Sequence, residues 1–297
     1  MRRTGAVIAV LAGLIAAAPA RAQTGSPPPY VPWTDVLPPL GSPDVQPGPV
    51  PNCRKASMKC VDNVIGRLRR ARNRFGCDHR AVFADTYLLL TRQFKTTVKR
   101  NPRFFADQRW VETEDATFAN FYTRMLADQR AGRPLPEAWQ IAVDTAASGD
   151  ANAAQDMLLG INAHVQRDMP YVLASVGLRT PDGTTRKPDH EAVNHILADA
   201  YEPIVRDIER RYDPVISVTN TRWSPIDDIA GLEAVQGWRE GVWRNAERLL
   251  NAKTEADRQL VEQSIEQNAA NWARMIATPQ VPPGYRSSRD AYCRDHT

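Results

Sequence analysis

His164 and Asp168 are the residues of this sequence whose types and spacing are best suited to chemistry. They lie four positions apart in Gly160-Ile-Asn-Ala-His-Val-Gln-Arg-Asp-Met-Pro170, so a helix places them one turn apart on the same face. Apolar residues at helical spacing share that face: Met157, Leu158, Ile161, Val165, Val172 and Val176. The pair is therefore predicted to face the core, where each group needs a polar partner because an unpaired one costs several kcal/mol.

Two more residues complete a candidate set of four metal ligands. His190 opens the next predicted helix, and Asp85 lies in Phe83-Ala-Asp-Thr-Tyr-Leu-Leu-Leu90, which is apolar on almost every side. Imidazole nitrogens and carboxylate oxygens bind zinc-like ions, and a His/Asp pair at i, i+4 presents two ligands on one face. With the His164/Asp168 pair, these residues predict a site for a divalent metal such as zinc. The metal would activate water to hydrolyse a phosphoester or lipid.

A hydrogen-bond network in the core is the alternative to a metal site. In that interpretation Asp168 pairs with His164 or with a nearby arginine. Asn162 and Asn194 would support the site by capping backbone groups that Pro170 leaves without a partner. Buried polar networks are commoner than metal centres, and the protein would then be a non-catalytic structural or binding protein of the cell envelope.

Other catalytic patterns are missing from the sequence. No Gly-x-Ser-x-Gly setting surrounds a serine, so a serine hydrolase is disfavoured. There is no Gly-rich loop to cradle a phosphate and no dinucleotide-binding fingerprint. Trp238 and Trp243 could line a ligand groove, but their helical spacing is more typical of a core. A small-molecule or lipid ligand is compatible with the sequence, which identifies no protein partner.

The elements that position these residues are predicted to be α-helices almost throughout. From Lys55 to Ala277 apolar residues recur at helical spacing, and no sustained period-two run of β-branched residues indicates a strand. The predicted helices cover residues 57–75, 79–98, 111–131, 135–147, 151–177, 189–212, 225–251 and 254–277. The fold class is all-α, a single multi-helix bundle of about eight helices over residues 55–278.

Residues 1–22 are typical of a secretory signal peptide. They combine a basic start, a short apolar segment and the Ala20-Arg21-Ala22 pattern that signal peptidase favours. Cleavage after Ala22 would export the protein to the periplasm or the extracellular space. The uncharged run of residues 4–20 is short for a membrane span, which takes about 20 residues, so stable membrane insertion is not expected.

Two further segments flank the predicted bundle. Repeated prolines in residues 23–54 remove backbone amides from any helix or ladder, so this segment is predicted to be an extended arm. Residues 279–297 are predicted to be a C-terminal tail that a disulfide ties to the body.

The charge of the chain gives no indication of nucleic-acid binding. The formal net charge is +4, and removing the predicted signal peptide with its three arginines and no acid leaves +1. A nearly neutral chain has no global field for nucleic acid. One predicted helix carries an arginine cluster without interleaved aromatic residues, which favours a solvated face: Arg67, Arg69, Arg70, Arg72 and Arg74.

An even number of cysteines in an exported chain indicates disulfides. The four are Cys53, Cys60, Cys77 and Cys293. A continuous helix over 57–75 would separate Cys60 from Cys77 by roughly 25 Å, which is beyond disulfide reach. Of the two remaining connectivities, we favour Cys53 with Cys60 and Cys77 with Cys293, because the second bond would fasten the C-terminal tail.

The chain resembles an uncharacterised family of helical bacterial proteins, catalogued only as a domain of unknown function, over about residues 60–250. The motifs that carry the resemblance are Phe83-Ala-Asp-Thr-Tyr-Leu88, Phe118-Ala-Asn-Phe-Tyr122, Trp139, Leu159 to Pro170, and His190-Glu-Ala-Val-Asn194. The most specific part is Gly-x-Asn-Ala-His-x-x-x-Asp-x-Pro. The resemblance implies an all-helical domain and supplies no activity.

His164 and Asp168 are also similar to the His-x-x-x-Asp element of zinc-dependent phospholipase C and single-strand nuclease enzymes. Those enzymes are exported and all-helical, and that similarity implies a zinc site. They use further histidines and a mature N-terminal Trp, whereas this chain has five His and a predicted mature start at Gln23. One or two ions therefore fit the sequence better than a trinuclear centre.

Overall fold

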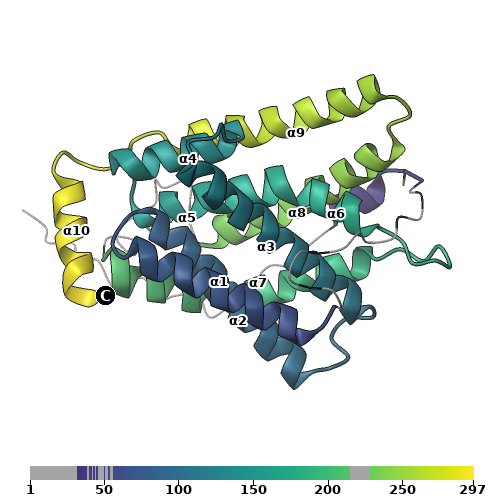
Figure 1. Ribbon diagram of the computed structural model, residues 1–297, viewed down its shortest axis with the longest axis horizontal. Helices are drawn as coiled ribbons and strands as arrows, with labels where there is room; N and C mark the ends of the chain where they lie inside the picture. Colours follow the sequence, from purple (N-terminus) through teal and green to yellow (C-terminus); the bar gives the residue numbers. More distant parts are fainter. Residues whose placement is uncertain are drawn as a thin grey trace, which may run out of the picture.

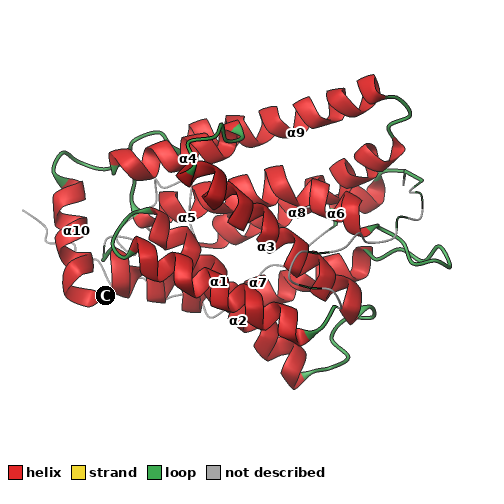
Figure 2. Cartoon of the chain, viewed as in Figure 1, coloured by secondary structure: helices red, strands yellow, loops and turns green. Residues whose placement is uncertain are grey.

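The computed structural model describes residues 32–38, 40, 41, 43, 45, 50, 53, 56–214 and 228–297. These residues form helices, and the only β pairing among them is two isolated bridges. The predicted all-α class is confirmed, and Figure 2 shows helices joined by loops. The predicted signal peptide and most of the predicted arm lie outside the described residues.

The helices follow the predicted order (Figure 1). They are η1 (Trp33–Val36), α1 (Met58–Phe75), α2 (Arg80–Arg100), α3 (Gln108–Arg130), α4 (Glu137–Ser148), α5 (Ala153–Asn162), η2 (Ala163–Asp168), α6 (Met169–Val176), α7 (Lys187–Tyr212), α8 (Asp228–Asn251), α9 (Glu255–Ile276) and α10 (Tyr285–His296). Each predicted helix is present, although the predicted start of one, residues 225–227, lies outside the described residues. The predicted C-terminal tail contains a helix, α10, that the sequence reasoning missed.

The first half of helix α2 is buried in the bundle. Its sequence is apolar on nearly every side from Ala81 to Leu88, and all of these residues are buried. Helices α1, α5 and α7 pack against it. Elsewhere in the bundle α4 packs against α9 and α6 against α8; Figure 1 shows α9 along the upper edge and α1 and α2 below. Helix α7 packs chiefly against α2 and only slightly against α5.

The predicted 151–177 helix is interrupted by a π-helical segment, η2. In this segment the Met169 amide donates to the His164 carbonyl, five residues earlier. The wider turn lies directly before Pro170, which has no amide to donate to the Gln166 carbonyl. It places Ala163–Asp168 in contact with α3, α4, α5, α6, α8 and α9. The segment that carries His164 is thus the point where most of the bundle meets.

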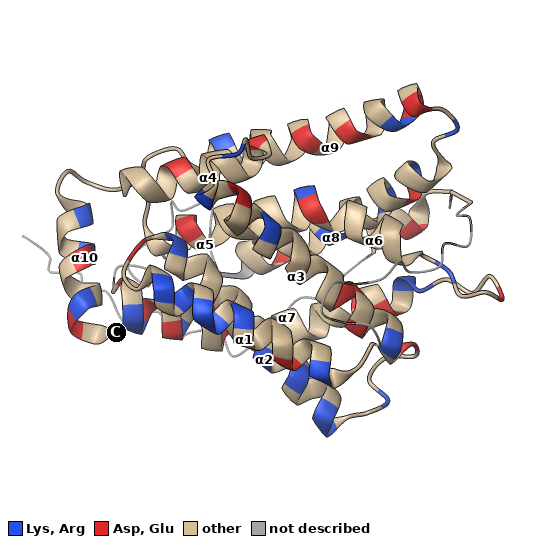
Figure 3. Cartoon of the chain, viewed as in Figure 1, with Lys and Arg blue, Asp and Glu red and all other residues tan. Residues whose placement is uncertain are grey.

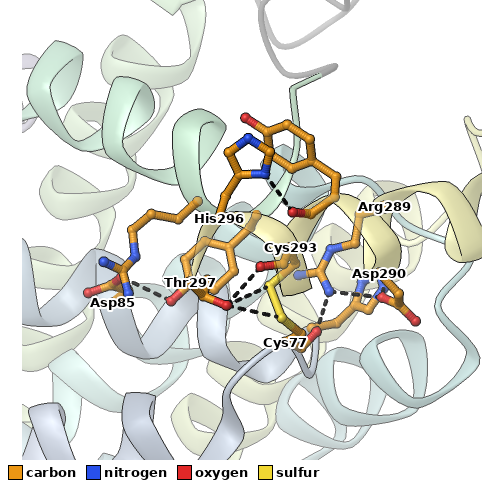
Figure 4. The surroundings of a disulfide bond; sticks show 11 residues. Cys77, Asp85, Arg289, Asp290, Cys293, His296 and Thr297 are labelled. Carbon is orange, nitrogen blue, oxygen red and sulfur yellow. Dashed lines mark hydrogen bonds and ion pairs between the residues drawn. A yellow bond between two sulfur atoms is a disulfide. The ribbon is translucent and has the colours of Figure 1, made fainter.

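Both favoured disulfides are present. Cys53 is bonded to Cys60 and Cys77 to Cys293. The second bond fastens α10 to the loop between α1 and α2, as Figure 4 shows. Beneath it the buried Arg289 side chain donates to the Cys77 carbonyl. The C-terminal segment is thereby tied to the body, as predicted.

The arginines of α1 are only partly a solvated face. Arg69, Arg70 and Arg74 are exposed, and the basic residues of α1 stand out in Figure 3. Arg67 and Arg72 are half-buried, and they donate to Asn120 on α3 and Asp85 on α2, respectively. Among the described helices, none is both long enough and apolar enough to cross a bilayer.

Candidate functional site

His164 and Asp168 face inward and bond to each other, as the sequence pattern indicates. Both are buried, and His164 Nδ1 lies 2.9 Å from Asp168 Oδ2. Asp168 also accepts from Trp139 Nε1 at 3.0 Å and from Arg167 Nη1 at 3.0 Å. An ionised carboxylate can only accept, so the hydrogen lies on Nδ1 and the lone pair of the ring lies on Nε2. Nε2 has no hydrogen-bond partner among the described residues.

The imidazole of His164 sits in an aromatic cage. Its ring stacks on Phe118, with centroids 3.5 Å apart and planes 6° from parallel. Four further aromatic rings have centroids 5.0–5.9 Å from it: Phe83, Tyr87, Tyr122 and Trp139. Burial lowers the pKa of His164, and Asp168 only partly offsets that effect. The ring is therefore neutral at pH 7, and Nε2 is a hydrogen-bond acceptor.

Gly160 allows the cage to close. A Cβ atom at this position would overlap the ring of Phe83 on α2. The absence of a side chain lets α5 approach α2 closely enough for Phe83 to reach the imidazole. This close approach accounts for the glycine at the start of the motif.

His164 lies on the wall of a cavity of about 160 Å³. Side chains from α2, α3, α5, α7 and α8 line it, and most of them are apolar, including Leu90, Phe94, Val111, Met157, Ile196 and Leu197. Four lining residues carry a buried polar atom with no hydrogen-bond partner in the described part of the chain: Tyr87 Oη, Glu114 Oε2, Asp115 Oδ2 and His164 Nε2. Buried polar atoms are rarely unpaired, so this cavity is the candidate site.

One acid and one phenol on the wall of this cavity have shifted pKa values. Burial of its carboxylate, followed by the nearby charges of Glu114 and Glu112, raises the pKa of Asp115 to about 7, against the opposing effect of Arg67. Burial also raises the pKa of Tyr87 well above its ordinary range. Near pH 7 the cavity therefore offers a phenol hydrogen, a partly protonated carboxyl group and a neutral imidazole.

Asp85 belongs to a different cluster. It is fully buried, and its Oδ2 accepts from Tyr212 Oη at 2.9 Å and lies 3.2 Å from Arg211 Nε. Its Oδ1 lies 3.3 Å from Arg72 Nη1. Figure 4 shows it near the bond between Cys77 and Cys293. Asp85 thus has structural partners of its own and does not reach His164.

His190 and Asn194 form a third cluster, around the buried Arg239. Arg239 donates to the His190 carbonyl and, through Nε, to Asn194 Oδ1 at 2.8 Å. His190 Nδ1 lies 3.8 Å from Glu114 Oε1. Burial and the charge of Arg239 lower the pKa of His190. Because Arg239 and Glu114 also line the cavity, this cluster borders the candidate site without adding His190 to it.

Asn162 does not have the hydrogen-bond partners that were predicted for it. Its amide donates to the Ala269 carbonyl on α9 at 2.9 Å, and its Oδ1 accepts from Gln166. It links η2 to α9 and does not cap groups freed by Pro170.

The four predicted metal ligands are not brought together, since only His164 and Asp168 are partners. Within the described ranges, no group of three or more His, Cys, Asp or Glu side chains could hold a metal ion. Metal binding therefore stays a prediction. The sequence reasoning missed Glu114, Asp115 and Arg239. Two adjacent acids at the edge of an apolar helical pattern were the signal that could have identified the first two.

Comparison with known proteins gives a family and no activity. Residues 61–279 match a family model described as "Family of unknown function (DUF5995)". No curated protein and no solved structure matches the chain. The likeness to zinc-dependent phospholipases and nucleases receives no support from these searches. The matched residues run from α1 to α9 and include every residue named above on the cavity wall. The chain belongs to the family of unknown function DUF5995.

Proposed function

We propose that this protein binds a mainly apolar small molecule in the cavity beside His164. The observation that carries the proposal is the set of four unpaired polar atoms on a mainly apolar wall. Ligand sites typically combine apolar walls with a few polar groups that fix orientation. The apolar body of the ligand would contact side chains such as Leu90 and Ile196, while its polar group meets His164 or Tyr87.

The volume of the cavity limits the size of the ligand. An apolar cavity of roughly 150 Å³ admits benzene, and this one measures about 160 Å³. A ring compound or a short acyl chain therefore fits better than a nucleotide or a peptide. The His164 imidazole is a neutral acceptor and Tyr87 a donor, so a polar but uncharged group on the ligand matches the wall.

An exported location is part of the proposal. It is supported by the signal-peptide pattern of residues 1–22 and by two disulfides, which form in oxidising compartments. In that setting the protein would be a binding protein of the periplasm or the extracellular space.

Binding of toluene, a small apolar probe, followed by isothermal titration calorimetry, tests this function. Leu197 lines the cavity, and Leu197→Trp would fill part of it. Leu260 is 65% exposed on α9, and Leu260→Trp is the matched control. We expect saturable binding to the wild type, a tenfold or greater loss in Leu197→Trp and no loss in Leu260→Trp. Equal binding by all three proteins, or no binding, would refute the proposal.

The metal-assisted hydrolase is a second candidate, supported by the unpaired Nε2 of His164. It would require ligands beyond the four predicted residues, because Asp85 and His190 have other partners. Elemental analysis of tag-free protein tests it. Stoichiometric zinc in the wild type that is lost from a folded His164→Ala variant would support the metal; equal metal content in both would count against it.

A further inference from the structure

The wall of the cavity holds a base in a fixed orientation. Asp168 binds His164 Nδ1, and Phe118 stacks on the face of the imidazole, while Nε2 has no partner in the described residues. An imidazole that is neutral, oriented by a carboxylate and unpaired at the other nitrogen is suited to act as a general base.

The described cavity wall offers no cysteine thiol or serine hydroxyl as a nucleophile. All four cysteines are in disulfides, and no serine is among the described lining residues. The hydroxyls of Thr86 and Thr91 donate to helix carbonyls at 2.9 and 2.8 Å. The remaining groups are acids and bases, which transfer protons and do not need to form covalent intermediates.

Two hydrogen-bond donors lie on the same wall as the base. Tyr87 keeps its phenol hydrogen at neutral pH, because burial raises its pKa. Asp115 is partly protonated near pH 7. The Tyr87 and His164 rings are adjacent, with centroids 5.0 Å apart, and Asp115 is one turn of α3 from Phe118, which stacks on His164. In an apolar site, a tyrosine hydroxyl and a neutral carboxyl group can polarise a carbonyl oxygen.

We propose that the cavity catalyses keto–enol proton transfer on an apolar carbonyl compound, an inference that rests on the proposed binding function. His164 Nε2 takes a proton from the carbon next to the carbonyl. The electron pair of that C–H bond forms the new C=C bond, and the carbonyl π pair moves to the oxygen, which accepts from Tyr87 or Asp115. The imidazolium exchanges its proton with solvent and gives one back to the carbon; the C=C pair forms the new C–H bond while the oxygen pair re-forms the C=O bond. The cycle balances without an oxidant or a second substrate.

Deuterium exchange into 2-tetralone, an apolar two-ring ketone, tests this inference. Proton NMR in D₂O follows loss of the hydrogens next to the carbonyl, and displacement of toluene measures ketone binding separately. We expect the wild type to accelerate exchange about 100-fold or more over buffer. His164→Gln should abolish the acceleration. Tyr87→Phe, which removes a donor to the ketone oxygen, should lower the rate at least tenfold. Tyr292→Phe on α10 is the matched control.

The outcomes separate the two proposals. Displacement of the probe without exchange overturns catalysis and leaves binding intact. A bound probe that 2-tetralone does not displace also overturns carbonyl recognition. Absence of probe binding refutes the binding function itself. Unchanged exchange in both His164→Gln and Tyr87→Phe would place the chemistry elsewhere.

Asp168 acts in this scheme as a positioning residue, and the pH profile tests that role. Asp168 raises the pKa of His164, so Asp168→Asn should lower the exchange rate and move the acid limb of the profile to lower pH. A slower reaction with an unmoved acid limb would mean that Asp168 only supports the fold.

Discussion

Phe118 and His164 lie face to face, with ring centroids 3.5 Å apart. Phe118 belongs to α3, and Glu114 and Asp115 lie one turn before it on the same helix. His164 belongs to η2, where its Nδ1 atom is hydrogen-bonded to Asp168. The stacking of Phe118 on His164 therefore fixes the position of the imidazole relative to Glu114 and Asp115 on the cavity wall, although α3 and η2 are far apart in sequence.

Gly160→Ala tests the close approach that closes the cage. The added Cβ would overlap the Phe83 ring, so α5 or α2 must shift. Overpacking of this kind destabilises by about 1–3 kcal/mol, which urea unfolding followed by circular dichroism can measure. Gly241→Ala in α8 is the matched control, because a Cβ there meets no atom within 4 Å. It should stabilise by up to about 1 kcal/mol. Similar effects at both glycines would contradict the packing argument.

Much of the fold could be predicted from the sequence, because it depends on local patterns. Helical periodicity predicted the helices, and the segment of α2 that is apolar on almost every side is buried. The distance along one helix excluded a bond between Cys60 and Cys77 and left the observed connectivity among two. Helix α10 was missed because its sequence, Tyr285–His296, is strongly polar. What holds it is the Cys77–Cys293 bond and the buried Arg289.

The candidate site could be predicted only in part, since it depends on contacts between distant segments. Spacing within one helix predicted that His164 and Asp168 face inward together. Spacing cannot show that Trp139 would be the donor to Asp168, or that Asp85 would pair with Tyr212, 127 residues away. The π-helical turn that carries the pair follows from tertiary packing as well as from Pro170.

Removing the hydroxyl group should affect the stability of the protein differently at two buried tyrosines, Tyr87 and Tyr212. Tyr87 Oη has no partner in the described structure, whereas Tyr212 Oη donates to Asp85 at 2.9 Å. Tyr87→Phe removes an unsatisfied polar group and should leave the free energy of unfolding unchanged or raise it. Tyr212→Phe takes a donor from a buried carboxylate and should lower it by about 1–3 kcal/mol. Chemical denaturation of both variants checks this, and equal losses would show that Tyr87 is paired.

Asp115→Asn should stabilise the protein more at high pH than at low pH. The folded pKa of Asp115 is about 7, raised from an ordinary value of 3.8. Between these values the folded state binds more protons than the unfolded state, so the contribution of this group to stability falls as pH rises. The neutral Asn lacks that dependence. The stability difference between variant and wild type should therefore grow from pH 4 to 7 and then level off.

Several charged or titratable groups surround Asp115 and must be kept unchanged in that comparison. They are Glu112 and Glu114 on α3, Arg67 on α1 and Tyr87 on α2. Urea unfolding at a series of pH values gives the difference directly. Asp150→Asn, at an exposed position before α5, is the control. A difference for Asp115→Asn that is constant with pH would show that its carboxylate is not desolvated.

The two disulfides should contribute unequally to stability. Cys77 and Cys293 are 216 residues apart in sequence, whereas Cys53 and Cys60 are 7 apart. In the chain-entropy account, the larger closed loop removes more freedom from the unfolded state, about 5 kcal/mol against about 2–3 kcal/mol. The double variant Cys77→Ala, Cys293→Ala should therefore lose more free energy of unfolding than Cys53→Ala, Cys60→Ala. Release of α10 would also expose Arg289 and the polar groups beneath it, which adds to the loss. Thermal unfolding of both double variants measures the order, and a larger loss for the pair at 53 and 60 would show that the short loop anchors the bundle more than α10 does.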